Sequence, residues 1–131
     1  MKSYTNIEQS QKLAEILPLK SADMEYILEQ WIDEKTHRHK EGYYEIPVVK
    51  VDDDCPLQPI THPCWSLAAL LNVLPKNLDI GRPVLATNYR GYYWVSYFDE
   101  YMKEKFTSKI YNNPIDACYE MILKLHEQNL L

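Results

Sequence analysis

Hydrophobic residues are most continuous in the segment 61–75, which has a proline near each end. Proline is tolerated in the first turn of a helix, and it ends a helix because it restricts the residue before it. The interval between Pro63 and Pro75 therefore predicts a central helix. Four leucines at helical spacing are expected in its buried surface: Leu67, Leu70, Leu71 and Leu74.

Two further segments have the signals of helix starts. Thr5 and Glu8 have the spacing of a capping box, and an apolar stripe follows them as far as Pro18. Near the other end, Asn113 suits a cap and Pro114 suits the first helical position. The sequence predicts a first helix and a C-terminal helix, the latter with a buried face made of Ile115, Cys118, Ile122 and Leu125.

Strand patterns dominate the region after the central helix. The aromatic and β-branched segments 84–89 and 92–98 flank Arg90-Gly91 and predict a hairpin, and 105–111 alternates as a third strand. Earlier in the chain, 43–51 reads as an edge strand that Pro47 demotes or splits, because proline cannot donate to a ladder.

The segment 24–34 permits two interpretations. Met24, Ile27, Leu28 and Trp31 fit helical spacing with Ser21 as the cap, and periodicity slightly favours this helix. Tyr26, Leu28 and Ile32, interrupted by polar positions, also permit a strand. The charged segment that follows contains a glycine and predicts a turn or loop.

Length and composition predict one domain over residues 1–131, because 46% hydrophobic residues suffice for a single core. Together with the pattern, they predict an α+β fold. We expect a small antiparallel sheet of three or more strands, packed against the central and C-terminal helices.

The charge and the apolar runs limit the partners and the compartment. A net charge of −5 argues against a nucleic-acid partner, because binding to phosphates depends on Lys and Arg. No signal-like segment or run of roughly 20 apolar residues is present, so we expect neither export nor a membrane helix. The three cysteines, Cys55, Cys64 and Cys118, suggest reduced thiols in the cytoplasm.

Cys64 is the candidate nucleophile, because a helix N-terminus stabilises a thiolate. His62 or His126 would be the base. The glycine-rich context that papain-type peptidases place before their cysteine is absent, and a free cysteine commonly acts as a small core residue. A buried Cys64 beside Trp65 is the alternative.

Nitrogen and sulfur side chains in one irregular region are the candidate metal ligands: His37, His39, Cys55, His62 and Cys64. They form only pairs at i, i+2 without a CxxC motif, which favours scattered histidines over a zinc site. The acidic run 52–54 lacks the alternating ligands of a calcium loop. We therefore expect no cofactor and no metal.

Aromatic residues are concentrated in the predicted hairpin, within a chain that has 11 tyrosines. Tyrosine supplies contact area at low entropic cost, so an exposed row would form a binding platform. Tyrosines filling half-exposed strand positions are the alternative. The candidate binding residues are Tyr89, Tyr92, Tyr93, Trp94 and Tyr97.

Two stretches, Pro63-Cys64-Trp65-Ser66-Leu67 and Asn113-Pro114-Ile115-Asp116-Ala117, carry a resemblance. In them the chain resembles a group of small bacterial proteins encoded in phage-like or other mobile genomic regions. The resemblance implies a related fold and genomic setting, and it favours a strand at Met24. It implies no reaction.

The expected function is a non-catalytic interaction or accessory protein, because no paired carboxylates, nucleophile motif or phosphate loop is found. Its partner would be another protein. A thiol-dependent hydrolase built on Cys64 and a self-associating structural domain are the alternatives.

Overall fold

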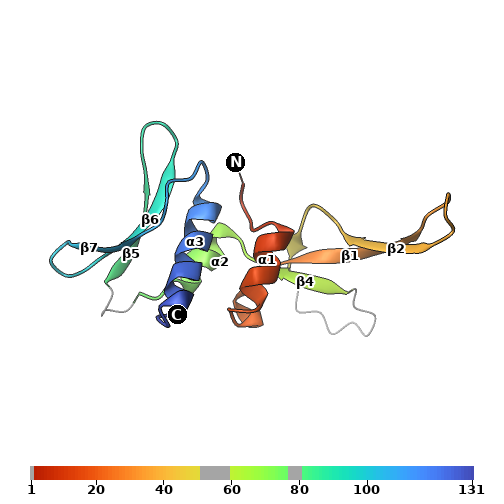
Figure 1. Ribbon diagram of the computed structural model, residues 1–131, viewed down its shortest axis with the longest axis horizontal. Helices are drawn as coiled ribbons and strands as arrows, with labels where there is room; N and C mark the ends of the chain where they lie inside the picture. The colour runs from red at the N-terminus through yellow and green to blue at the C-terminus, as the bar shows by residue number, and fades with distance from the viewer. Residues whose placement is uncertain (1, 51–59, 77–80) are drawn as a thin grey trace. The chain divides into compact units, whose positions relative to one another are not determined.

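The structure is a computed structural model that describes residues 2–50, 60–76 and 81–131. The chain divides into two compact units, Asn6–Trp65 and a second made of Met1–Thr5 with Ser66–Leu131. We call them the first and second units. Both contain helices and antiparallel strands, so the α+β prediction is confirmed, with two small sheets where one was expected (Figure 1). The prediction of one domain over the whole chain stays a prediction.

The first unit is a sheet arranged around one long strand. Strand β1 (Met24–Ile32) pairs antiparallel with β2 (His39–Tyr43), β3 (Val48–Val49) and β4 (Thr61–Cys64). Met24 pairs with both Val49 and Cys64, so β3 and β4 lie on opposite edges of β1. Helix α1 (Ile7–Ala14) packs against β4, and a short 3₁₀ helix, η1 (Leu19–Ser21), leads into β1.

Helix α1 begins one residue later than the sequence predicts. The side chain of Asn6 accepts a hydrogen bond from the Gln9 N–H at 2.8 Å, and the Gln9 side chain accepts one from the Asn6 N–H. The capping box is therefore Asn6 with Gln9, and the proposed pair of Thr5 and Glu8 is wrong. Thr5 is itself fully buried.

The open choice at 24–34 is decided in favour of a strand. One edge of β1 pairs with β2 in the adjoining hairpin and the other with β4 farther along the chain, and this pairing satisfies the backbone N–H and C=O groups of β1. The predicted loop after it is shorter than expected, because β2 begins at His39. The strand predicted over 43–51 is largely wrong: among its described residues only Tyr43, at the end of β2, and Val48–Val49, in β3, belong to strands, and Pro47 lies in the gap between them.

The second unit is a three-stranded meander with two helices. Strands β5 (Arg82–Thr87), β6 (Tyr93–Phe98) and β7 (Glu104–Thr107) pair in sequence order, as predicted. Helix α3 (Pro114–Glu127) packs against β6 and against α2 (Leu67–Val73). Asn113 caps α3 and Pro114 is its first residue, and all four residues predicted for its buried face are 0% exposed.

The central helix is shorter than its prolines predict. Residues Thr61–Cys64 form β4, and α2 begins only at Leu67, after Ser66 accepts a hydrogen bond from the Ala69 N–H. Pro63 thus lies in a strand that pairs with β1. Of the four leucines, Leu70 and Leu74 are buried, whereas Leu67 and Leu71 are only half-buried.

One turn design recurs in the three hairpins that the described residues form, β1–β2, β5–β6 and β6–β7. Each turn starts with an Asp or Asn whose side-chain oxygen accepts hydrogen bonds from two later backbone N–H groups. Each turn also contains a residue with positive φ. The starting residues are Asp33, Asn88 and Asp99, and the positive-φ residues are His37, Gly91 and Met102. The tips of these hairpins are therefore held by local hydrogen bonds.

Candidate functional site

Cys64 does not lie where a nucleophile would. It is the last residue of β4, it precedes the cap of α2, and it is 0% exposed. Its position at a helix N-terminus was predicted from Pro63, and that prediction is wrong. A thiol without access to solvent cannot meet a substrate in this conformation, so the alternative of a buried core cysteine is the one observed.

The two candidate bases differ in their surroundings. His62 lies on β4 with its Nδ1 2.9 Å from the Pro63 carbonyl oxygen, and its ring meets Tyr43 edge-on with 5.8 Å between the ring centroids. His126 is exposed in the last turn of α3, in the second unit. One ring nitrogen of His62 is thus occupied by a backbone carbonyl.

The proposed metal ligands do not converge. No group of three or more His, Cys, Asp or Glu side chains that could hold a metal ion occurs among the described residues. His37 lies in the turn between β1 and β2, His39 begins β2, and His62 lies on β4. Cys55 and the acidic run 52–54 lie outside the described residues.

The aromatic hairpin of β5 and β6 presents two different faces. The face with Val95 and Tyr97 is buried, and α3 packs against this strand. Tyr93 is half-buried on the same face, where its backbone pairs with Tyr111 at 2.7 and 2.8 Å. Trp94 alternates to the opposite face, opposite Ala86.

Tyr97 therefore is not part of a binding platform. Its side chain is 0% exposed, its hydroxyl donates to the Pro75 carbonyl at 2.9 Å, and burial raises its pKa. Burial likewise raises the pKa of the Cys118 thiol to about 12. These groups form the interior of the second unit.

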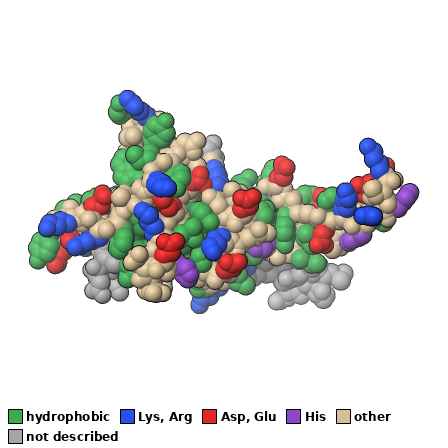
Figure 2. Space-filling view, in the orientation of Figure 1, with side chains coloured by type: hydrophobic (Ala, Val, Ile, Leu, Met, Phe, Trp, Pro, Cys, Tyr) green, Lys and Arg blue, Asp and Glu red, His purple; other side chains and the backbone are tan. Residues whose placement is uncertain are grey.

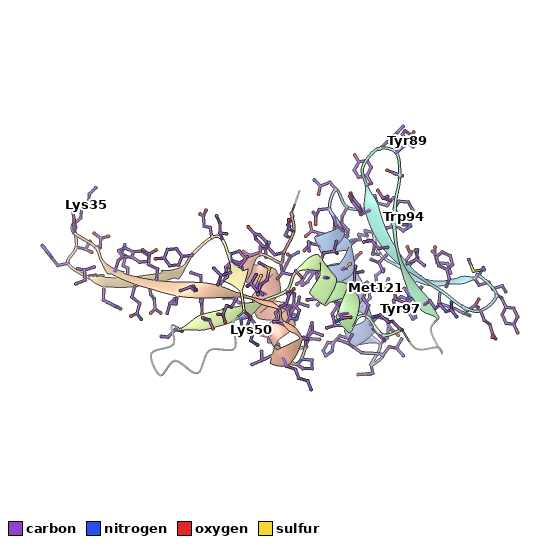
Figure 3. The ribbon with its side chains drawn as sticks, turned by 180° about the vertical axis from the view of Figure 1, so that it is seen from behind. Lys35, Lys50, Tyr89, Trp94, Tyr97 and Met121 are labelled. Carbon is purple, nitrogen blue, oxygen red and sulfur yellow. The ribbon has the colours of Figure 1, made fainter. Side chains whose placement is uncertain are left out.

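Of the five predicted binding residues, Tyr89 and Tyr92 are exposed, and Trp94 is half-buried on the face of the hairpin opposite to Tyr97. Tyr89 is 91% exposed at the tip, and Tyr92 is 42% exposed. Figure 3 shows Tyr89 at the tip and Trp94 farther down the hairpin. Val84, also 42% exposed, lies on the same outer face of the sheet as Trp94. We call Tyr89, Tyr92, Trp94 and Val84 the aromatic face; Figure 2 shows hydrophobic side chains along this hairpin.

The tip of this hairpin is pre-organised. Asn88 Oδ1 accepts hydrogen bonds from the Arg90 and Tyr92 N–H groups at 3.0 and 3.1 Å, and Gly91 supplies the positive φ. Arg90 Nε donates to the Tyr89 hydroxyl at 3.1 Å, with its guanidinium 5.5 Å from the ring centroid. A tyrosine and an arginine thus stand together on a fixed turn.

A second exposed apolar surface was not predicted. The strand register places Ile27 and Trp31 on the face of the first sheet opposite to buried Tyr26, and Tyr44 pairs with Ile27. Trp31, Tyr44, Ile46 and Val48 are 42%, 49%, 73% and 42% exposed. The sequence signal for this surface is the alternation of side chains along β1. It is hard to recognise because the same apolar residues also fit helical spacing.

Fold and surfaces together describe a small α+β protein whose described hairpins expose aromatic and aliphatic side chains and whose candidate nucleophile is buried. No family model, curated protein or solved structure matches the chain. Among the described residues, no helix has the length and apolarity needed to cross a bilayer.

Proposed function

We propose that this protein is a non-catalytic interaction protein that binds a protein partner through the aromatic face. The observation that supports this proposal is the exposure of Tyr89 on a turn held by Asn88. Tyrosine and arginine are enriched among the residues that dominate binding energy, and a fixed turn reduces the entropy lost on association. The proposal that it serves a phage-like or other mobile element rests on the sequence resemblance of the segments 63–67 and 113–117.

Charge supports the choice of a protein over a nucleic acid as the partner. Residues 82–98 contain two arginines and no acidic residue, in a chain of net charge −5. Two cations neutralise too few phosphates for stable binding to nucleic acid, whereas they suit a protein surface with a few carboxylates.

The test compares two tyrosine variants in the full chain. The double variant Tyr89→Ala/Tyr92→Ala removes the exposed rings of the aromatic face. Tyr101→Ala is the matched control, because Tyr101 is 78% exposed in the other turn of the same sheet. We expect a partner that co-purifies from the native host with the wild type and with Tyr101→Ala, and that is lost with the double variant.

Purified partner and protein then give the affinity. A loss of at least about tenfold in the double variant is expected, since exposed hot-spot tyrosines cost more than 1 kcal/mol on truncation. Equal binding by all three proteins would contradict the proposal. Light scattering tests the alternative of self-association. A wild-type dimer that the double variant abolishes would make the aromatic face a self-association surface.

A further inference from the structure

We propose that the first unit holds a separate docking site, a hollow that receives an aliphatic side chain of a basic segment in a partner protein. The hollow has a volume of about 530 Å³ and is lined by Ile27, Tyr44, Glu45, Ile46 and Val48. It lies in a different unit from the aromatic face. The inference therefore goes beyond the proposed function, and either can fail without the other.

The hollow is formed where the chain leaves the edge of β1 between β2 and β3. The Tyr44 N–H donates to the Ile27 carbonyl at 2.9 Å, and pairing resumes only where Val48 stands opposite Glu25. Between these points the chain arches outward, with Pro47 buried and Ile46 73% exposed. Ile27 of β1 and residues of this arch together line an open, mostly apolar recess.

The recess is apolar on the inside and acidic around it. Glu45 belongs to its lining, and the register places Glu25 and Glu29 on the same sheet face as Ile27. No ion pair between described residues involves these three carboxylates.

Basic side chains around the hollow are fewer. Lys40 shares this face opposite Trp31, but its Nζ is paired with Asp33 at 3.1 Å. Lys50 follows β3 and is exposed. Carboxylates therefore outnumber free ammonium groups near the hollow.

This arrangement selects the occupant. An apolar recess of this size accepts aliphatic side chains, because their burial is favourable in proportion to area. Three carboxylates beside it attract cations and repel anions, so the segment that carries the anchor should also carry Lys or Arg. An extended segment suits the site because the recess lies beside the strands β1 and β3.

The probe is a blocked peptide, acetyl-Lys-Leu-Lys-Leu-Lys-amide, titrated into the intact ¹⁵N-labelled protein. Two matched peptides replace either every Lys by Glu or every Leu by Ser. We expect saturable shifts of the Ile27, Tyr44 and Val48 amide signals with the first peptide at about 1 mM, the range of a weak single-segment contact. The other two peptides should each bind at least about tenfold more weakly.

Paired variants locate the site. Val48→Ser removes an apolar wall, and Val49→Ser is its control because the next residue points to the opposite face. Glu45→Lys reverses a charge in the lining, and Glu41→Lys makes the same change on the other face of β2. All four positions are exposed, so the variants should fold.

The expected result is weaker binding for Val48→Ser and Glu45→Lys, by about tenfold and severalfold, with both controls unchanged. Absence of saturable shifts overturns the proposal. So does equal binding of the Lys and Glu peptides, or equal loss in the variants and their controls. None of these results bears on the aromatic face.

Discussion

The indole Nε1 of Trp65 donates a hydrogen bond of 2.9 Å to Ser21 Oγ, across 44 positions of sequence. Ser21 Oγ in turn donates to the Pro18 carbonyl at 2.6 Å. Trp65 is 0% exposed and Ser21 is half-buried, so the donor of this bond lies in the core and its acceptor at the edge of the core. It joins the end of β4 to η1, and it fixes the point at which the chain enters β1.

Ser21→Ala should therefore destabilise the protein. Removing an acceptor from a buried donor costs about 1–3 kcal/mol, because the donor is left without that partner and without water. Urea unfolding followed by circular dichroism would measure the change. Lys20→Ala is the control, since Lys20 is exposed in the same 3₁₀ helix. A cost no larger than that of the control would show that the Trp65–Ser21 bond is dispensable.

Gly81→Ala should be far more destabilising than Gly91→Ala. Both glycines have positive φ, +93° and +79°, which a Cβ disfavours by about 1–2 kcal/mol. A Cβ on Gly81 would also clash with the Phe98 carbonyl oxygen, whereas one on Gly91 meets no described atom within 4 Å. We expect a further loss of about 2 kcal/mol or more for Gly81→Ala, by denaturant unfolding. Equal losses would contradict the close approach of β5 to Phe98.

The two hairpin turns that start with an aspartate, Asp33 and Asp99, should weaken in acid. The Lys40 ammonium and the Lys35 and Thr36 N–H groups lower the pKa of Asp33, and the Lys103 and Tyr101 N–H groups with Lys105 lower that of Asp99. A pKa lowered in the folded state means that the unfolded state binds protons first. The stabilisation is therefore complete above the unfolded pKa of about 3.9, and it is lost as the pH falls through the folded pKa.

The double variant Asp33→Asn/Asp99→Asn keeps the side-chain oxygen acceptors but removes the charges. Between about pH 5 and pH 2, the range that brackets the reference pKa of aspartate, its melting temperature should consequently fall less than that of the wild type. Glu34→Gln is the control in the same turn, because Glu34 makes no hydrogen bond with a described residue. If the melting temperature of the double variant falls as much between pH 5 and pH 2 as that of the wild type, the carboxylates of Asp33 and Asp99 do not stabilise the turns.

The thiols of Cys64 and Cys118 should be protected from a disulfide reagent. Both are 0% exposed, and burial raises the pKa of Cys118. In a Cys55→Ser variant we expect both thiols to react at least about 100-fold more slowly in the native protein than in urea, because reaction requires opening of the core. Rapid labelling of native Cys64 would restore the thiol-dependent hydrolase hypothesis.

Local chemistry explains which elements were predictable. Asn113, Pro114 and Asp116 act within a single helical turn, so the start of α3 follows from adjacent residues. The hairpin of β5 and β6 is similarly local, because its turn is closed by Asn88 and Gly91. The face that each of its residues takes required the packing of α3 on β6, which buried Tyr97 and left Tyr89 outside.

The sequence by itself determined the α+β class, the meander and the C-terminal helix, because periodicity, caps and turns act between near neighbours. Tertiary structure decided that Met24–Ile32 is a strand, since β4, its partner at 61–64, is distant in sequence, although β2 pairs with it as the next arm of a hairpin. Because they pair with β1, residues Thr61–Cys64 form a strand where the prolines predict a helix, and Cys64 is buried. The same pairing also created the hollow above Ile27, which depends on an arch between two strands and has no signature in the order of residues.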